Sequence, residues 1–145
     1  MNQVEFDIPL LPPSLNMYRN IHWGKRRKIQ KLWREYVLTE WLKLKRPEYE
    51  AVHITVHFLF PDRRVRDIDN YIATGSKLIG DALKGCFIPD DSPRHLRGWS
   101  FQFSIDHQNS GTIIKLTEVK GGKDQRDHLR GRAFKDLGHI QRYPG

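Results

Sequence analysis

The segment from residue 52 to residue 60 constrains the fold more than any other part of the chain. Every second residue in it is apolar, and these side chains are Val52, Ile54, Val56, Phe58 and Phe60. A period of two is typical of a β-strand with one buried face. Such a strand needs neighbouring strands and a second layer over its apolar face, so we expect a sheet covered by helices.

Three further strands are predicted by the same pattern. Residues 4–8 alternate before a proline, and residues 99–105 and 112–118 alternate on either side of a turn at 107–111, which predicts a β-hairpin. His53 and His57 share the polar face of the 52–60 strand. Two histidines at that spacing suit a metal site, but residues of an ordinary sheet face are more common, and we interpret them so.

Two helices are predicted between the strands. From residue 25 to residue 44 the apolar residues recur at steps of three and four, which is typical of an amphipathic helix packed on a core. A second helix is predicted over residues 70–84 with Gly85 as its C-cap, although Gly75 and Gly80 lower its helix propensity. This element order predicts an α+β fold in which two helices pack on a small mixed four-stranded sheet.

The length of 145 residues suits one domain. Residues 1–120 contain all the predicted elements, and residues 121–145 are expected to form a basic tail outside the core. No apolar run approaches the roughly 18 residues of a membrane span, and residues 1–8 do not have the pattern of a secretory signal, so neither is expected. Cys86 is the single cysteine, which favours a reducing, cytoplasmic setting.

Basic charge is concentrated around the start of the first predicted helix. The formal net charge is +8, and the segment from Arg19 to Arg34 contains no acidic residue. Clustered cations attract phosphate groups and release counterions from nucleic acid, so DNA is the expected partner. A solvated helix face kept soluble by like charge is the alternative. The residues expected to contact DNA are Arg19, Lys25, Arg26, Arg27, Lys28 and Lys31, with Arg63, Arg64 and Arg66.

Acidic residues flank the second predicted helix. Asp67, Asp69 and Asn70 stand at its start, and Asp90-Asp91 follow its end. Phosphodiester hydrolysis needs oxygen ligands that hold Mg²⁺ against the phosphate, and several carboxylates in a basic protein suit that chemistry. Because a helix of about 15 residues spans roughly 20 Å, the loop after it must fold back for the two groups to meet. Taken singly, Asp69 has the alternative role of helix N-cap and Asp90-Asp91 that of a turn.

Lys77 is a further candidate. It lies seven residues after Asn70, the step that returns to the same face of a helix. Its ammonium group is placed to stabilise a charged phosphate or to lower the pKa of an attacking water. An ordinary exposed helix lysine is the alternative.

Four motifs together resemble the RusA family of Holliday-junction resolvases. In chain order they are Pro12-Pro13-Ser14-x-Asn16-x-Tyr18, Arg66-Asp67-Ile68-Asp69-Asn70, Lys77 with Asp81-Ala82-Leu83, and Ile88-Pro89-Asp90-Asp91-Ser92. The resemblance covers residues 5–118. Its most specific part is the Arg-Asp-x-Asp-Asn block with the later Asp-Asp pair.

The resemblance implies a homodimeric, Mg²⁺-dependent nuclease that cuts two strands of like polarity across a four-way DNA junction, with Mn²⁺ as a possible substitute. It implies Asp67, Asp69 and Asp91 as catalytic carboxylates and metal ligands, and Lys77 as the catalytic lysine. Residues 73–76 lengthen the stretch before the lysine relative to the founding member, so an extended or kinked helix is expected there.

The leading hypothesis is therefore a structure-selective endonuclease that acts on branched DNA. A DNA-binding module without nuclease activity is the alternative, with the aspartates as helix caps and turn formers. A nuclease for another substrate, such as a replication fork or a flap, is a third hypothesis.

Overall fold

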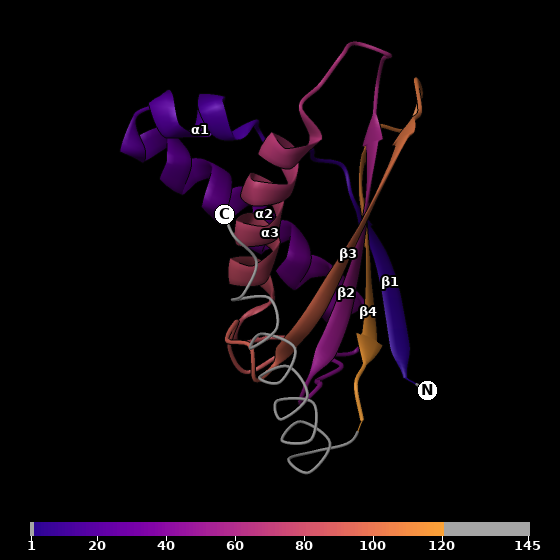
Figure 1. The fold of residues 1–145 in the computed structure, drawn as a ribbon. Helices are drawn as coiled ribbons and strands as arrows, with labels where there is room; N and C mark the ends of the chain where they lie inside the picture. The colour runs from indigo at the N-terminus through magenta and orange to yellow at the C-terminus, as the bar shows by residue number, and fades with distance from the viewer. Residues whose placement is uncertain (1, 121–145) are drawn as a thin grey trace, which may run out of the picture.

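The computed structural model describes residues 2–120, which form a four-stranded mixed sheet with three helices on one face (Figure 1). The expected α+β fold is confirmed. Along the chain the elements are β1 (Gln3–Ile8), α1 (Leu15–Asn20), α2 (Trp23–Lys43), β2 (Val52–Phe60), α3 (Ile68–Leu83), β3 (Leu96–Ile105) and β4 (Gly111–Glu118). None of these helices is long and apolar enough to cross a membrane. The tail predicted at residues 121–145 lies outside the described residues.

The sheet has the strand order β1-β4-β2-β3. β2 pairs in parallel with β3 and antiparallel with β4, and β4 pairs antiparallel with β1. The predicted hairpin of residues 99–105 and 112–118 is therefore wrong, because β2 separates the two strands. The connection between them passes the end of β2, where the Asp106 N–H donates to the Phe60 carbonyl at 2.8 Å. Alternation identifies strands, but it does not specify which strands become neighbours.

The apolar face of β2 is covered by α2 and α3. Both predicted helices are confirmed, and each begins two residues earlier than expected. Leu32 and Tyr36, which fall within the predicted apolar stripe of α2, are instead exposed. Fully buried side chains from both helices meet those of the strands, and the largest are Trp33, Val37, Leu78, Ile79, Leu83, Ile54, Phe58, Ile114 and Leu116.

α1 is a helix that the apolar pattern does not predict. It has six residues, and only Tyr18 among them is buried, so no apolar repeat marks it. Ser14 caps its start, since the Ser14 hydroxyl accepts a hydrogen bond from the Met17 N–H at 3.3 Å. α1 contacts α3, and Figure 1 shows the first turns of α2 at the same end of the molecule as the start of α3.

Two glycines in α3 differ in the space around them. A Cβ added at Gly75 would lie 2.7 Å from Cζ of the fully buried Phe58, whereas one at Gly80 would have its nearest neighbour, Cδ1 of Leu96, at 3.6 Å. We expect Gly75→Ala to lower the free energy of unfolding by about 1–2 kcal/mol, because overpacking outweighs the gain in helix propensity. Gly80→Ala should raise it by up to about 1 kcal/mol.

Urea unfolding followed by circular dichroism measures both variants, and Gly80→Ala is the matched control for the helix-propensity effect. A Gly75→Ala protein as stable as the wild type would show that α3 and β2 are not packed this closely.

Candidate active site and nucleic-acid surface

The start of α3 presents two exposed carboxylates, Asp67 and Asp69. Asp67 is the N-cap residue, but its side chain makes no capping hydrogen bond, and Asp69 lies in the first helical turn. The N-cap alternative for Asp69 is therefore wrong. The positive end of the helix dipole favours negative charge at both positions.

Arg66 holds the loop that leads into α3. Its guanidinium group donates to the Asp62 carboxylate at 2.6 Å and to the carbonyls of Asp62 and Arg64 at 2.8 and 3.1 Å. The guanidinium carbon also lies 4.4 Å from the ring centroid of Phe60, and the Arg66 side chain is only 6% exposed. Hydrogen bonds from the Arg64 backbone and from Arg66 hold the pKa of Asp62 below its ordinary value. Arg66 thus positions the residues that present Asp67.

The end of α3 holds a second pair of carboxylates, Asp81 and Asp91, whose carboxyl groups lie within hydrogen-bonding range. Asp91 reaches the helix because Phe87 and Ile88, both fully buried, anchor the preceding loop to the core. The loop folds back only as far as the last turns of α3. An open pocket of about 380 Å³ at this place is lined by Ser76, Lys77, Gly80, Asp81, Asp91, Leu96 and Trp99.

The charge state of this pair depends on its surroundings. Burial raises the pKa of Asp81 above its ordinary value, and Asp91 raises it further through a hydrogen bond and like charge. The positive charges of Lys77 and Lys84 act in the opposite direction. Two carboxylates this close repel each other when both are charged, so the pair favours a shared proton or a bound cation.

Asp90 has a different role from its neighbour. Its Oδ1 accepts a hydrogen bond from the Ser92 N–H at 2.8 Å, and its Oδ2 lies 3.6 Å from Nε2 of the buried His95. Hydrogen bonds from Ser92, and then the charge of His95, hold the pKa of Asp90 below its ordinary value. Asp90 therefore forms the turn, and Asp91 is the aspartate of the pair that faces α3.

The pKa of Asp81 leads to a prediction about stability. Because this pKa is higher in the folded chain than in the unfolded chain, the folded state binds the proton more tightly, and the stability that this group contributes falls as pH rises through that range. We expect Asp81→Asn to be more stable than the wild type at pH 7. The difference should disappear below about pH 4, where the unfolded-state carboxyl is protonated too.

Asp106→Asn is the control, and the opposite change in stability is expected for it. Hydrogen bonds from the Asn109 and Gln108 backbone lower the pKa of Asp106, so this variant should be less stable than the wild type at pH 7 and equal to it at low pH. Urea unfolding between about pH 2 and pH 8 measures both variants. An Asp81→Asn protein that is less stable than the wild type at pH 7 would contradict the unfavourable pairing of Asp81 with Asp91.

The three predicted catalytic carboxylates do not converge within one copy of the chain. Asp69 and Asp81 are separated by roughly 18 Å along α3, and Asp91 lies beside Asp81. Lys77 shares the pocket of Asp91, and the rise of α3 between Asp69 and Lys77 is roughly 12 Å. α3 is one helix through residues 73–76, so this stretch lengthens the helix and moves its two ends apart.

Carboxylate oxygens are the ligands that Mg²⁺ prefers, so the donors at each end of α3 suit this ion. Within residues 2–120, however, no three His, Cys, Asp or Glu side chains lie close enough together to hold a metal ion. Among these residues, Asp67 and Asp69 lie at the start of α3 and Asp81 and Asp91 lie at its end.

Asp81 belongs to one of the motifs that carry the family resemblance, but it was not predicted to be a site residue. Two features of the sequence account for its place in the second cluster. Its four-residue step from Lys77 places both side chains on one face of α3. The intervening Gly80 has no side chain, so Asp91 approaches the helix until its Cβ lies 3.9 Å from where a Cβ of residue 80 would stand.

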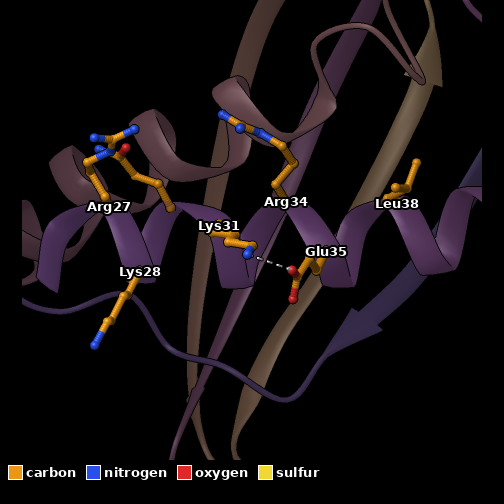
Figure 2. Close-up of a pocket in the computed structure, with 7 residues that line it drawn as sticks. Arg27, Lys28, Lys31, Arg34, Glu35 and Leu38 are labelled. Carbon is orange, nitrogen blue, oxygen red and sulfur yellow. Dashed lines mark ion pairs between the residues drawn. The ribbon is translucent and has the colours of Figure 1, made fainter. Parts of the chain in front are cut away.

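A basic surface lies along the first half of α2. Arg27, Lys28, Lys31 and Arg34 project from successive turns of the helix and line an open pocket (Figure 2), and we call these four residues the α2 basic surface. Lys31 pairs loosely with Glu35 at 3.9 Å, and both side chains are mostly exposed, so the pair leaves the lysine charge accessible. Arg34 extends this surface one turn beyond the predicted residues.

The remaining residues expected on DNA fall into two groups. Arg26 is half-buried, and its guanidinium carbon lies 6.0 Å from the ring centroid of Tyr18, so it packs α2 against α1. The Arg66 guanidinium group is engaged in hydrogen bonds within the loop before α3. The exposed members are placed to reach a phosphate backbone, and these are Arg19, Lys25, Arg63 and Arg64.

No protein-family model matches the chain, and no curated protein matches it.

Proposed function

We propose that this chain is a Mg²⁺-dependent, structure-selective endonuclease that hydrolyses phosphodiester bonds in branched DNA, in the manner expected of a RusA-like Holliday-junction resolvase. The observation that carries the proposal is the presence of two carboxylate clusters, one at each end of α3, in a chain of net charge +8. Exposed carboxylates repel phosphate, so a surface that only binds DNA gains nothing from them. A phosphodiester hydrolase needs them as cation ligands.

The proposed roles follow from position. Asp67, Asp69 and Asp91 would hold Mg²⁺, and Mn²⁺ suits the same oxygen donors. When bound, the ion supplies polarisation of the scissile phosphate and a more acidic water. Asp81 lies beside Asp91 in the pocket, where a bound cation would relieve the repulsion between the two carboxylates. The Lys77 ammonium in the same pocket would stabilise negative charge that develops on the phosphate.

We propose further that the complete site forms between two copies of the chain. Asp69 and Asp91 are too far apart in one copy because α3 separates them by roughly 18 Å. A two-fold axis that sets two α3 helices antiparallel would place the start of one helix beside the end of the other. Such a homodimer carries two equivalent sites, which matches the two equivalent scissile phosphates of a four-way junction.

The α2 basic surface, with Arg63 and Arg64, supplies the phosphate contacts in this proposal. Contacts of this kind respond to the shape of the DNA backbone and weaken steeply with salt. Recombination and repair are the processes that produce such branched DNA. The buried free thiol of Cys86 suits a reducing, cytoplasmic setting.

Cleavage of a synthetic four-way junction in Mg²⁺ tests the proposal. The wild type should nick the junction, and Asp69→Asn should nick it roughly a thousandfold more slowly while binding it with similar affinity in EDTA. A linear duplex of the same arm sequence is the control substrate, and replication forks and flaps in competition reveal a different branched substrate. Equal cleavage rates for the wild type and Asp69→Asn would remove Asp69 from the catalytic site.

A DNA-binding module without nuclease activity is the second candidate. The observation that favours it is the lack of three converging carboxylates within residues 2–120 of one copy. Calorimetric titration with Mg²⁺ and Mn²⁺ separates the two candidates. A nuclease should bind metal in a way that Asp69→Asn and Asp91→Asn both weaken, whereas a binding module should show no such site.

A further inference from the structure

Trp23 is the most exposed aromatic side chain among the residues that the structure describes. It lies in the first turn of α2 and is 59% exposed. The other tryptophans serve the fold: Trp33 is 1% exposed, Trp41 donates a hydrogen bond to the Pro47 carbonyl at 2.9 Å, and Trp99 stacks on a phenylalanine. A single exposed apolar side chain is common on protein surfaces, so its surroundings decide what it can bind.

Those surroundings are basic. No acidic residue occurs from residue 8 to residue 34, and Trp23 is followed almost directly by Lys25, Arg26, Arg27 and Lys28. The Arg27 guanidinium carbon lies 5.6 Å from the centroid of the Trp23 ring, and the His22 ring lies 5.4 Å away at a tilt of 33°. These two contacts hold the indole in place and still leave more than half of it exposed.

An aromatic ring among cations matches the chemistry of single-stranded nucleic acid. In such sites the ring stacks on a base, and the neighbouring lysine and arginine side chains bind the flanking phosphates. An uncharged apolar partner would gain nothing from the positive charge around Trp23, whereas a polyanion with aromatic bases uses both features.

We propose that Trp23 stacks on a nucleobase that is unpaired or unstacked at a DNA branch point, and that it thereby favours branched DNA over continuous duplex. Bases in a continuous duplex are already stacked on both faces, so the indole has no base to reach without breaking the helix. A branch point or a single strand offers a free base. This inference rests on the proposed action on branched DNA and names a residue that recognises the branch.

The test uses the full chain in EDTA, so that binding is measured without cleavage. A short thymidine oligonucleotide, a continuous duplex and a four-way junction are titrated, with DNA anisotropy and protein tryptophan fluorescence as readouts. We expect Trp23→Ala to bind the oligonucleotide and the junction roughly tenfold more weakly than the wild type, with little change for the duplex. Trp23→Phe keeps an aromatic ring and should retain most of the affinity.

Tyr36→Ala is the matched control, because Tyr36 is an exposed aromatic on the same helix but away from the residues 25–28 cluster. It should bind all three DNAs as the wild type does. Oligonucleotide binding should also quench the tryptophan fluorescence of the wild type and of Tyr36→Ala, and this quenching should be lost in Trp23→Ala.

Three outcomes would overturn the inference. Trp23→Ala could bind the oligonucleotide as tightly as the wild type, or it could lose as much affinity for the duplex as for the oligonucleotide. The third is a lower sedimentation mass of Trp23→Ala than of the wild type, which would make Trp23 a contact between copies. The proposed nuclease is judged separately by junction cleavage in Mg²⁺. Trp23-dependent binding without any cleavage would reject the proposed nuclease and support the base-stacking role. Cleavage together with binding that does not depend on Trp23 would support the nuclease and reject the base-stacking role.

Discussion

Mixing the Asp69→Asn and Asp91→Asn proteins should restore junction cleavage that neither protein has alone. If the site is shared between two copies, a dimer of one Asp69→Asn chain and one Asp91→Asn chain has one site with both substitutions and one with neither. Random exchange of subunits makes about half of the dimers mixed, so nicking should return to about a quarter of the wild-type rate. Each variant alone should be slower by roughly a thousandfold, so the recovery is large.

The control mixture combines Asp67→Asn with Asp69→Asn. Both substitutions lie at the start of α3, so every site in a mixed dimer has lost one carboxylate, and no recovery is expected. Nicking of a labelled four-way junction, after the proteins have been incubated together to exchange subunits, measures both mixtures. If the Asp69→Asn and Asp91→Asn mixture stays inactive although mixed dimers are present, the site does not lie between copies.

Removing two charges from the α2 basic surface should weaken DNA binding strongly. We expect the double variant Lys28→Ala with Lys31→Ala to bind a four-way junction on the order of a hundredfold more weakly at low salt. Each phosphate contact contributes close to one unit to the slope of the logarithm of affinity against the logarithm of salt concentration, so the slope should become shallower by about two. Titrations in EDTA at several salt concentrations give both quantities.

The matched control removes two lysines near the other end of α2. Lys43→Ala with Lys45→Ala changes the net charge by the same amount at exposed positions away from the α2 basic surface. It should lower the affinity only slightly, through the weaker overall field of the protein. A loss of affinity as large as that of the first variant would mean that total charge, and not the α2 basic surface, determines binding.

Much of the fold was predictable because side-chain periodicity reports directly on burial. The β2 segment, with five apolar side chains on one face, was predicted with its observed bounds. Pairing was not predictable: β3 and β4 are adjacent in sequence and have the pattern of a hairpin, but both pair with β2, on opposite edges. α1 escaped prediction because Tyr18 is its only buried residue, which leaves no repeat to recognise.

The candidate site, like the fold, was predictable only in part. The order of the aspartates along the chain correctly placed Asp67 and Asp69 at the start of a helix and Asp91 after its end. Whether Asp91 reaches Asp67 and Asp69 depends on where the loop after α3 folds back, and the buried Phe87 and Ile88 hold that loop beside the end of the helix instead. No local pattern reports such a long-range contact. Arg66 was expected on phosphate for the same reason, because its charge is evident in the sequence and its contacts with Asp62 are not.

The position of β4 between β1 and β2 has a consequence for how the chain folds. β1 and β2 do not pair with each other, because β4 lies between them and pairs with both. β1 therefore has no partner strand, and one edge of β2 stays unpaired, until residues 111–118 have been synthesised. Contacts between such distant segments slow folding and make it depend on the whole domain. A chain cut before residue 111 should therefore not keep a folded sheet, and this domain cannot be divided into an independently folding first and second half.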